Sequence, residues 1–199
     1  MNTPNIIRES SAGFFGTTLL DEMFRKRQVI CNGQITAENA DAIIAQLLHL
    51  HDEDPSTEIT MYINSPGGEV PAGLAIYDAM KAISCPIRTV CTSLAASMGA
   101  IIFSSGDKRE MLPHAKVMIH DPSSAGWINM PALKLDSSAK DLMRTREVLG
   151  NILAENTKRS LEEIYAKTAA DTYFSAQEAV DFGLADEVVY HLGGQHYVK

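Results

Sequence analysis

The sequence predicts an α/β fold in which helices cover a parallel sheet. Two apolar, β-branched segments, 58–63 and 87–92, are each followed by a turn rich in small residues and then by a helical pattern. This β-α-β-α order makes the two strands parallel, because parallel neighbours need a crossover helix. Both turns then lie at the carboxyl edge of the sheet, where open α/β sheets carry their sites.

The N-terminal elements follow from local patterns. Residues 28–31 predict a short strand that ends at a glycine turn, and Thr36 caps a helix. That helix has apolar residues along one face: Ala40, Ile43, Ile44, Leu47 and Leu50. A second helix is expected at about 71–83, after the turn at 64–68, and a third begins at Met98.

The C-terminal half predicts a strand at 116–119 and a long helix at about 131–158. Leucines seven residues apart give this helix a narrow apolar stripe, which is typical of a helix that associates with another surface. Capping boxes open two short helices after Ser160 and Ser175, and a final strand is expected at 188–190.

Residues 1–18 are expected to form a flexible N-terminal arm, and residues 19–199 a single domain. The arm is a poor core-former, so a frayed terminus is the default prediction. It contains Phe14 and Phe15, however, and two exposed phenylalanines favour packing against a partner. The total length of 199 residues suits one sizeable core rather than two.

Composition excludes several function classes. A formal net charge of -8 argues against a nucleic-acid partner, because phosphate binding needs clustered Lys and Arg. No apolar run approaches the ~20 residues of a membrane span, and the N-terminus lacks a secretory pattern. Three cysteines without metal-like spacing suit a reducing compartment. We therefore expect a cytoplasmic protein with no membrane contact and no metal.

Ser97 is the strongest candidate for a reactive residue, because it lies where a predicted strand passes into a predicted helix. Its small neighbours in Ala-Ala-Ser-Met-Gly-Ala, residues 95–100, allow a tight bend that exposes the hydroxyl. The N-terminal amides of the new helix would lie close enough to stabilise an oxyanion. A serine that merely caps the helix gives the same pattern, so that alternative stays open.

A serine nucleophile needs a base, and His120 can project from the end of the strand at 116–119. His114 precedes that strand and is expected in a loop. The imidazole also needs a carboxylate to orient it, but the adjacent Asp121 would face the opposite way along a strand. The distant candidates are Asp171, Asp181 and Asp186. Asp171 lies between two predicted helices, in a loop where side chains can converge.

Four segments taken together resemble the proteolytic subunit of the ATP-dependent Clp protease, the ClpP family. They are Tyr-Ile-Asn-Ser-Pro-Gly-Gly at 62–68, residues 95–100, Val-Met-Ile-His at 117–120, and Asp171 followed by the segment 175–184. The segments occur in the family's order, and the resemblance spans about residues 29–189. It implies a crotonase-like α/β fold of repeated ββα units with a long protruding handle helix, the handle lying at about 121–158.

The resemblance also implies an activity and partners. Members of the family are serine endopeptidases that cleave unfolded proteins into short peptides. Their subunits form seven-membered rings that stack as a tetradecamer around a central chamber. An AAA+ unfoldase such as ClpX, ClpC or ClpA delivers the polypeptide substrate. Because the unfoldase uses the ATP, no cofactor is expected on this chain.

By the same resemblance, Ser97 is the nucleophile, His120 the general base and Asp171 the acid that orients it. The backbone N–H groups of Gly68 and Met98 would form the oxyanion hole. Further residues are implied in peptide-binding strands and in a pocket that docks the unfoldase. They are Gly67, Gly68, Glu69, Val70, Ser123, Ser124 and Ala125 for the strands, and Tyr62 and Val189 for the pocket.

The chain departs from the family pattern at several positions. Asp121 stands where the family usually has glutamine, and residues 169–170 are alanines where an acid and an arginine bridge the two rings. Thr60, Ala82 and Glu110 stand where aromatic residues line the docking pocket. These changes suggest a divergent subunit that docks or stacks weakly alone. The alternatives are a weakly active or regulatory ring subunit that works with a second ClpP paralogue, and a crotonase-type acyl-CoA enzyme.

Overall fold

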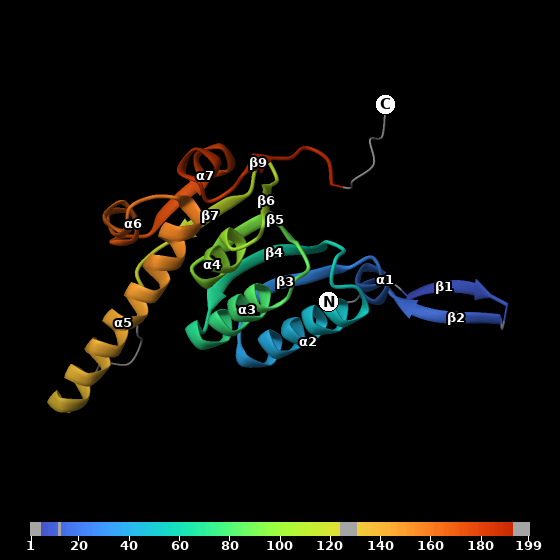
Figure 1. Cartoon of the computed structure of the whole chain (residues 1–199), viewed down its shortest axis with the longest axis horizontal. Coiled ribbons are helices and arrows are strands. Elements are labelled where there is room, and N and C mark those ends of the chain that lie inside the picture. The colour runs from blue at the N-terminus through green and yellow to red at the C-terminus, as the bar shows by residue number, and fades with distance from the viewer. Residues whose placement is uncertain (1–4, 12, 124–130, 193–199) are drawn as a thin grey trace.

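The structure is a computed structural model that describes residues 5–11, 13–123 and 131–192. Its central strands are β3 (Gln28–Ile35), β4 (Ile59–Gly68), β5 (Ile87–Ala96), β6 (Lys108–Met111), β7 (Lys116–Ile119), β8 (Thr172–Ser175) and β9 (Glu187–Val188). They form one sheet in the order β3-β4-β5-β6-β9, with β7 paired to β5 and β8 paired to β7 (Figure 1). Every pairing in this sheet is parallel except that of β7 with β8.

Helices pack along this sheet and extend beyond it. They are α1 (Leu19–Arg25), α2 (Ala37–Glu53), α3 (Val70–Ala82), α4 (Met98–Ser104), α5 (Ala132–Thr157), α6 (Leu161–Thr168) and α7 (Ala176–Phe182). Helices α2, α3 and α4 lie in a row beside the strands, each in contact with the next (Figure 1). The predicted α/β class with a parallel sheet is confirmed.

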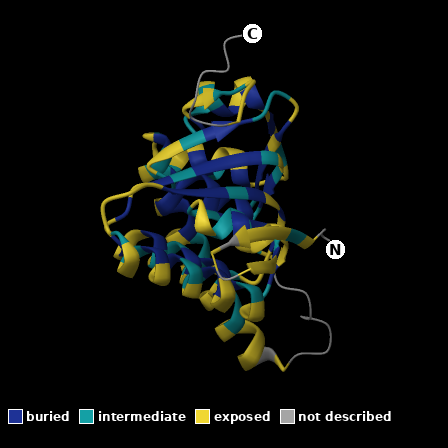
Figure 2. Cartoon of the chain, turned by 90° about the vertical axis from the view of Figure 1, so that its right-hand side faces the viewer, coloured by how far each residue is buried: buried dark blue, intermediate teal, exposed yellow. Residues whose placement is uncertain are grey.

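The core lies between the sheet and this row of helices, where the strands are buried (Figure 2). Helix α4 is buried along its whole length, and both Ile102 and Phe103 are fully inaccessible. A helix that is apolar all round is stable only inside a core. The start of α4, and with it the residue before Met98, is therefore held rigidly at the centre of the molecule.

The predicted long helix is confirmed as α5, which projects from the body of the protein like a handle (Figure 1). Only its C-terminal part enters the core, through Leu149, Ile152 and Leu153. Near its free end, Leu133 is 88% exposed and Leu135 is also exposed. The N-terminal part of the leucine stripe therefore remains uncovered in the single chain.

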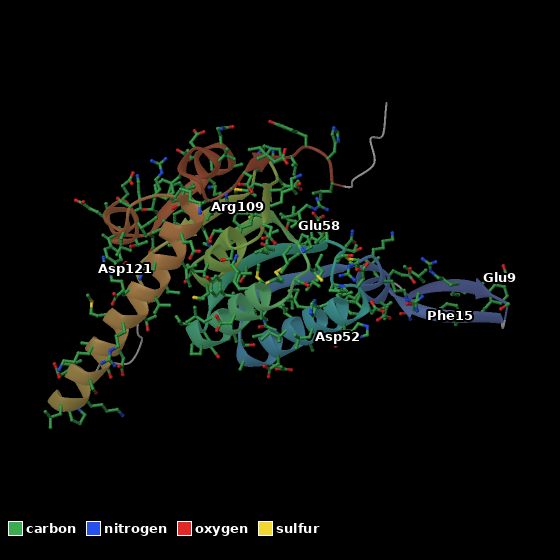
Figure 3. The ribbon with its side chains drawn as sticks, viewed as in Figure 1. Glu9, Phe15, Asp52, Glu58, Arg109 and Asp121 are labelled. Atoms are coloured by element: carbon green, nitrogen blue, oxygen red, sulfur yellow. The ribbon has the colours of Figure 1, made fainter. Side chains whose placement is uncertain are left out.

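The expectation of a frayed N-terminus is wrong for residues 5–10 and 13–18. These residues form two strands, β1 (Asn5–Ser10) and β2 (Gly13–Thr18), which pair antiparallel in a hairpin that projects opposite α5 (Figure 1). The side chain of Phe14 is 76% exposed, and Phe15 also lies on this projecting hairpin (Figure 3). The assignment of residues 1–18 as a flexible arm stays a prediction.

Three strands are longer than the sequence predicts. Strands β3, β4 and β5 continue to Ile35, Gly68 and Ala96, because β4 keeps pairing with β3 past an irregularity in the register. The last strand is β9 (Glu187–Val188) rather than 188–190. The turn expected at 64–68 is thus part of a strand, in which Gly67 adopts a φ of 90°.

Candidate active site

Ser97 occupies a strained turn between β5 and α4. Its φ of 55° and ψ of -122° are rare for any residue but glycine, and such strain collects at functional sites. Ser97 stands at the N-cap of α4, yet its side chain makes no capping hydrogen bond within the described chain. Its Oγ instead lies 2.8 Å from Nε2 of His120. The alternative of a serine that merely caps the helix is therefore wrong.

The pairing of β7 with β8 brings His120 and Asp171 together. Ile119 at the end of β7 lies opposite Thr172 at the start of β8 in an antiparallel register. The residues one step beyond, His120 and Asp171, therefore face each other. Nδ1 of His120 lies 3.2 Å from Oδ1 of Asp171, whose side chain is 63% exposed.

Ser97, His120 and Asp171 thus form a continuous line of hydrogen-bonding atoms. A proton on Nδ1 of the imidazole faces the carboxylate and leaves Nε2 free to accept the hydroxyl proton. Such a line can convert a hydroxyl into a nucleophile and stabilise the imidazolium that results. The other two acids lie elsewhere: Asp186 pairs with Arg109, and Asp181 accepts a hydrogen bond from Gln177. Asp121, the sequence neighbour of His120, pairs with Arg146 instead.

Two backbone N–H groups stand near the serine as candidate oxyanion donors. Met98 is the first residue of α4, so its N–H has no acceptor within the helix. Gly68 ends β4 and lines the same cavity as Ser97 and Met98. A Cβ at Gly67 would lie 2.7 Å from both the oxygen of Ala96 and the Cβ of Ser97. Only glycine allows these two segments to approach so closely.

Ser65 supports this glycine segment, and the sequence analysis did not single it out. It is fully buried, its Oγ donates to the carbonyl of Gly33 at 2.6 Å, and it accepts the N–H of Gly67 at 3.0 Å. On the other side, a Cβ at Gly68 would lie 2.0 Å from the oxygen of Ile35. The serine inside the Asn-Ser-Pro-Gly-Gly segment could have indicated this role. A buried hydroxyl needs hydrogen-bond partners, and the adjacent backbone provides them.

A cavity of about 120 Å³ adjoins the serine and the histidine. It is lined by Gly68, Val70, Ser97, Met98, Ile101, Ile119, His120, Asp121, Pro122, Ser123, Arg146, Leu149, Gly150, Leu153, Tyr165 and Thr168. The lining is mostly apolar near α4 and α5, with charged side chains from the segment after β7 and from α5. A cavity beside a nucleophile can accept one side chain of a bound substrate.

The residues predicted to bind peptide lie around this cavity only in part. Gly68, Val70 and Ser123 line it, whereas Glu69 is exposed and donates its backbone N–H to the carbonyl of Ile35. Gly67 is buried under the serine turn. Ser124 and Ala125 lie outside the described residues, and a role of this set in peptide binding stays a prediction.

The two docking-pocket candidates lie on different strands. Tyr62 is in β4, and Val189 follows β9, with β5 and β6 between those strands. The intervening face is polar: Arg88 donates to Thr60 at 3.0 Å and to the buried carboxylate of Glu110 at 2.9 Å. Two of the three positions that lack the family's aromatic residues, Thr60 and Glu110, thus belong to a network of hydrogen bonds.

The remaining reactive side chains of the described residues do not form a second centre. No group of three or more His, Cys, Asp or Glu in this part of the chain is placed to hold a metal ion. Burial raises the pKa of the Cys31 thiol to about 11 and that of the Cys91 thiol to about 12. Both are therefore protonated and unreactive near neutral pH. None of the described helices is long and apolar enough to span a membrane.

The fold and the site together define a class of protein. A serine at a strained strand-to-helix turn, within hydrogen-bonding distance of a histidine that contacts a carboxylate, is the arrangement of serine hydrolases. The sequence model of the Clp protease family matches residues 12–191. The chain therefore belongs to the Clp protease family, and is a ClpP-type serine peptidase with a crotonase-like fold.

Proposed function

We propose that this chain is a subunit of an ATP-dependent Clp protease and cleaves unfolded polypeptides into short peptides with Ser97 as its nucleophile. The observation that carries the proposal is the 2.8 Å contact of Ser97 Oγ with His120 Nε2, made by a serine whose side chain does not cap its helix. The hydroxyl oxygen of an ordinary capping serine would instead accept a hydrogen bond from a backbone N–H in the first turn of the helix.

In the proposed reaction, Nε2 of His120 takes the hydroxyl proton while Ser97 Oγ attacks the carbonyl carbon of the peptide bond. The negative oxygen of the tetrahedral intermediate accepts hydrogen bonds from the N–H groups of Gly68 and Met98. The imidazolium, stabilised by Asp171, then protonates the leaving amine, and an acyl-enzyme ester remains. A water molecule, deprotonated by His120, then attacks the ester in the same way. This step releases the new carboxyl end of the peptide and restores the Ser97 hydroxyl.

The most direct test of this mechanism is labelling by a fluorophosphonate, which reacts with activated serines. We expect labelling of the purified chain at one site, and its loss in Ser97→Ala. The matched control is Ser93→Ala, because Ser93 is an exposed serine of the same strand. A crotonase-type acyl-CoA enzyme needs no such nucleophile. Labelling that persists in Ser97→Ala would contradict the assignment.

The proposed assembly follows from the family, whose members generally form rings and work with unfoldases. The exposed leucines near the free end of α5, Leu133 and Leu135, support association between subunits. We propose heptameric rings that stack in pairs and receive substrate from an AAA+ unfoldase, in the cytoplasm. The unfoldase hydrolyses ATP, so the chain itself needs no cofactor.

A second candidate, a divergent ring subunit that works with a ClpP paralogue, is favoured by one observation. The face between Tyr62 and Val189 carries the Thr60, Arg88 and Glu110 network, which offers little apolar area for a docking loop. The test is the native mass and the unfoldase-dependent proteolysis of the chain, alone and mixed with a sister subunit. A stable tetradecamer of this chain that degrades protein with an unfoldase would contradict the need for a paralogue.

A further inference from the structure

We propose that the cavity beside Ser97 selects glutamine in the substrate, at the residue whose carbonyl carbon is attacked. This residue is called the acyl residue below. The inference rests on the proposed function, because it names the preferred substrate of that same site. It is carried by the charged end of the cavity, which Asp121 and Arg146 form.

The position of the cavity makes it the place for the acyl residue's side chain. Ser97, His120, Gly68 and Met98 all line it. A carbonyl carbon at Ser97 Oγ, with its oxygen toward the two amides, must carry its own side chain next to this opening. The volume of about 120 Å³ is somewhat smaller than the roughly 150 Å³ cavity that holds a benzene molecule. It suits an unbranched side chain of medium length and excludes the indole of tryptophan.

Two contacts hold the guanidinium of Arg146 in place at the charged end. Its Nε donates to Oδ2 of Asp121 at 2.7 Å, and its central carbon lies 3.6 Å from the centroid of the Tyr165 ring. The ring can lie against α5 because residue 150 is glycine: a Cβ there would be 2.7 Å from a ring carbon. Figure 3 shows Asp121 beside α5, the helix that carries Arg146. A stacked and paired guanidinium is pre-organised and loses little freedom on binding.

At this end of the cavity, Arg146 has N–H groups that are not used in hydrogen bonds to the described residues. Asp121 is engaged at both oxygens, because Oδ1 accepts from the hydroxyl of Thr168 at 2.6 Å while Oδ2 accepts from Arg146. A guanidinium has five N–H groups, and Arg146 uses the one on Nε. Within the described residues, the terminal nitrogens of Arg146 donate no hydrogen bond. The cavity therefore offers N–H groups to a substrate atom that can accept them.

Charge then decides which acceptor fits. The carboxylate of Asp121 already balances the charge of Arg146, so a glutamate would bring a second anion close to Asp121. A lysine would bring a second cation to Arg146. Methionine and leucine would cover the guanidinium without giving it an acceptor, which leaves donors unpaired. The amide oxygen of glutamine accepts without adding charge, and its chain has the length of methionine.

The experiment compares peptides that differ only in the acyl residue, each with a fluorescent leaving amine. Wild-type chain is expected to cleave the glutamine peptide at least about tenfold better in kcat/KM than the methionine, leucine and glutamate peptides. Arg146→Met keeps an apolar stem and removes the donors, so the glutamine-to-methionine ratio should fall to one or below. The control is Arg144→Met on the same helix, whose side chain is exposed and pairs with Asp141. Asp121→Asn should raise the relative rate of the glutamate peptide.

Several outcomes would overturn the inference. One is a wild-type chain that cleaves methionine or leucine peptides as well as the glutamine peptide, and this result needs no variant to fold. Another is a folded Arg146→Met whose ratio equals that of Arg144→Met. Cleavage that depends on Ser97 but prefers an apolar acyl residue would overturn this inference and leave the proposed function intact. A chain that cleaves no peptide and takes no fluorophosphonate label would overturn both.

Discussion

The backbone N–H of Ser97 donates a 2.9 Å hydrogen bond to the carbonyl oxygen of Met118. This bond ties the strained turn that carries the serine to β7, the strand from which His120 projects. Because Ala96 also pairs with Met118 in the sheet, the turn and the histidine share one rigid support. The serine–histidine distance is therefore fixed by backbone pairing rather than by the side chains themselves. Asp171, in contrast, reaches the site from an exposed position.

That exposure leads to the first prediction, on Asp171→Ala. Loss of the carboxylate removes the group that orients His120 and stabilises its cation, so kcat for peptide hydrolysis should fall about 10³- to 10⁴-fold. Because Asp171 is 63% exposed, the free energy of unfolding should change by less than about 1 kcal/mol. Steady-state kinetics and chemical denaturation measure the two effects.

The control for this variant is Asp181→Ala, which removes an exposed acid that the sequence left as an alternative. It should retain wild-type kcat. Near-normal turnover in Asp171→Ala, or a comparable loss in Asp181→Ala, would show that the acid is misassigned.

The second prediction concerns Gly68→Ala. A Cβ at this position would lie 2.0 Å from the oxygen of Ile35 and 2.7 Å from its nitrogen, so β3 and β4 would have to separate. Both atoms belong to the backbone and cannot rotate away. We expect a loss of about 3 kcal/mol or more in the free energy of unfolding, measured by urea denaturation. Gly16→Ala is the control, because a Cβ there meets no described atom within 4 Å. Equal stability of the two variants would count against the close approach.

The parts of the fold that could be predicted from the sequence depend on local interactions. Ser160 and Ser175 form the capping boxes expected of them, and Thr36 caps α2 as expected, because a cap and its partner lie three residues apart. The helical periodicity of α2 and α5 has the same local origin. Ser97 and His120 also lay at predicted strand ends, so their positions in the fold could be anticipated from pattern alone.

The parts that could not be predicted depend on pairing between distant segments. Strands β6 and β8 have four residues each, and a strand that short is stable only through its neighbours. Without β8, the residue pattern offered three acids and favoured Asp171 only by its place in a loop, and the family resemblance then assigned it. The register of β8 on β7 is what brings it to His120. The hairpin of β1 and β2 likewise depends on pairing between two segments. Their small and polar residues give no pattern that predicts this pairing.

The third prediction concerns the buried thiols Cys31 and Cys91. Burial raises the pKa of Cys31 to about 11 and that of Cys91 to about 12, so at pH 8 only about one Cys31 thiol in a thousand is ionised. The folded chain should therefore resist iodoacetamide at both residues, whereas the urea-unfolded chain should react at both. Peptide mass spectrometry measures the modified fraction at each cysteine. Rapid modification of Cys91 at a urea concentration that leaves the fold intact would contradict the burial.

The fourth prediction is a loss of stability in acid through Asp186. Burial raises the pKa of this carboxyl, but hydrogen bonds from the backbone and guanidinium of Arg109 lower it by more, to below the ordinary 3.8. Since the folded form holds the charged carboxylate, the pair contributes stability above about pH 4 that is lost as pH falls through the lowered pKa. Asp186→Asn removes this contribution, so the unfolding free energy of the variant should fall less than that of wild type between about pH 6 and pH 3, as measured by urea titration. This pH range spans the ordinary pKa of an aspartate.

Asp136→Asn provides the comparison for Asp186→Asn, because it removes an exposed acid of α5 that pairs only with Lys140 one turn away among the described residues. Such a surface pair contributes little, so this variant should follow the wild-type pH profile. Arg109 also donates to the carbonyls of Asn156 and Gly183, which join the end of α5 to the turn after α7. Asp186 therefore holds in place an arginine that ties three segments together. Parallel pH profiles for wild type and Asp186→Asn would show that the pair does not stabilise this junction.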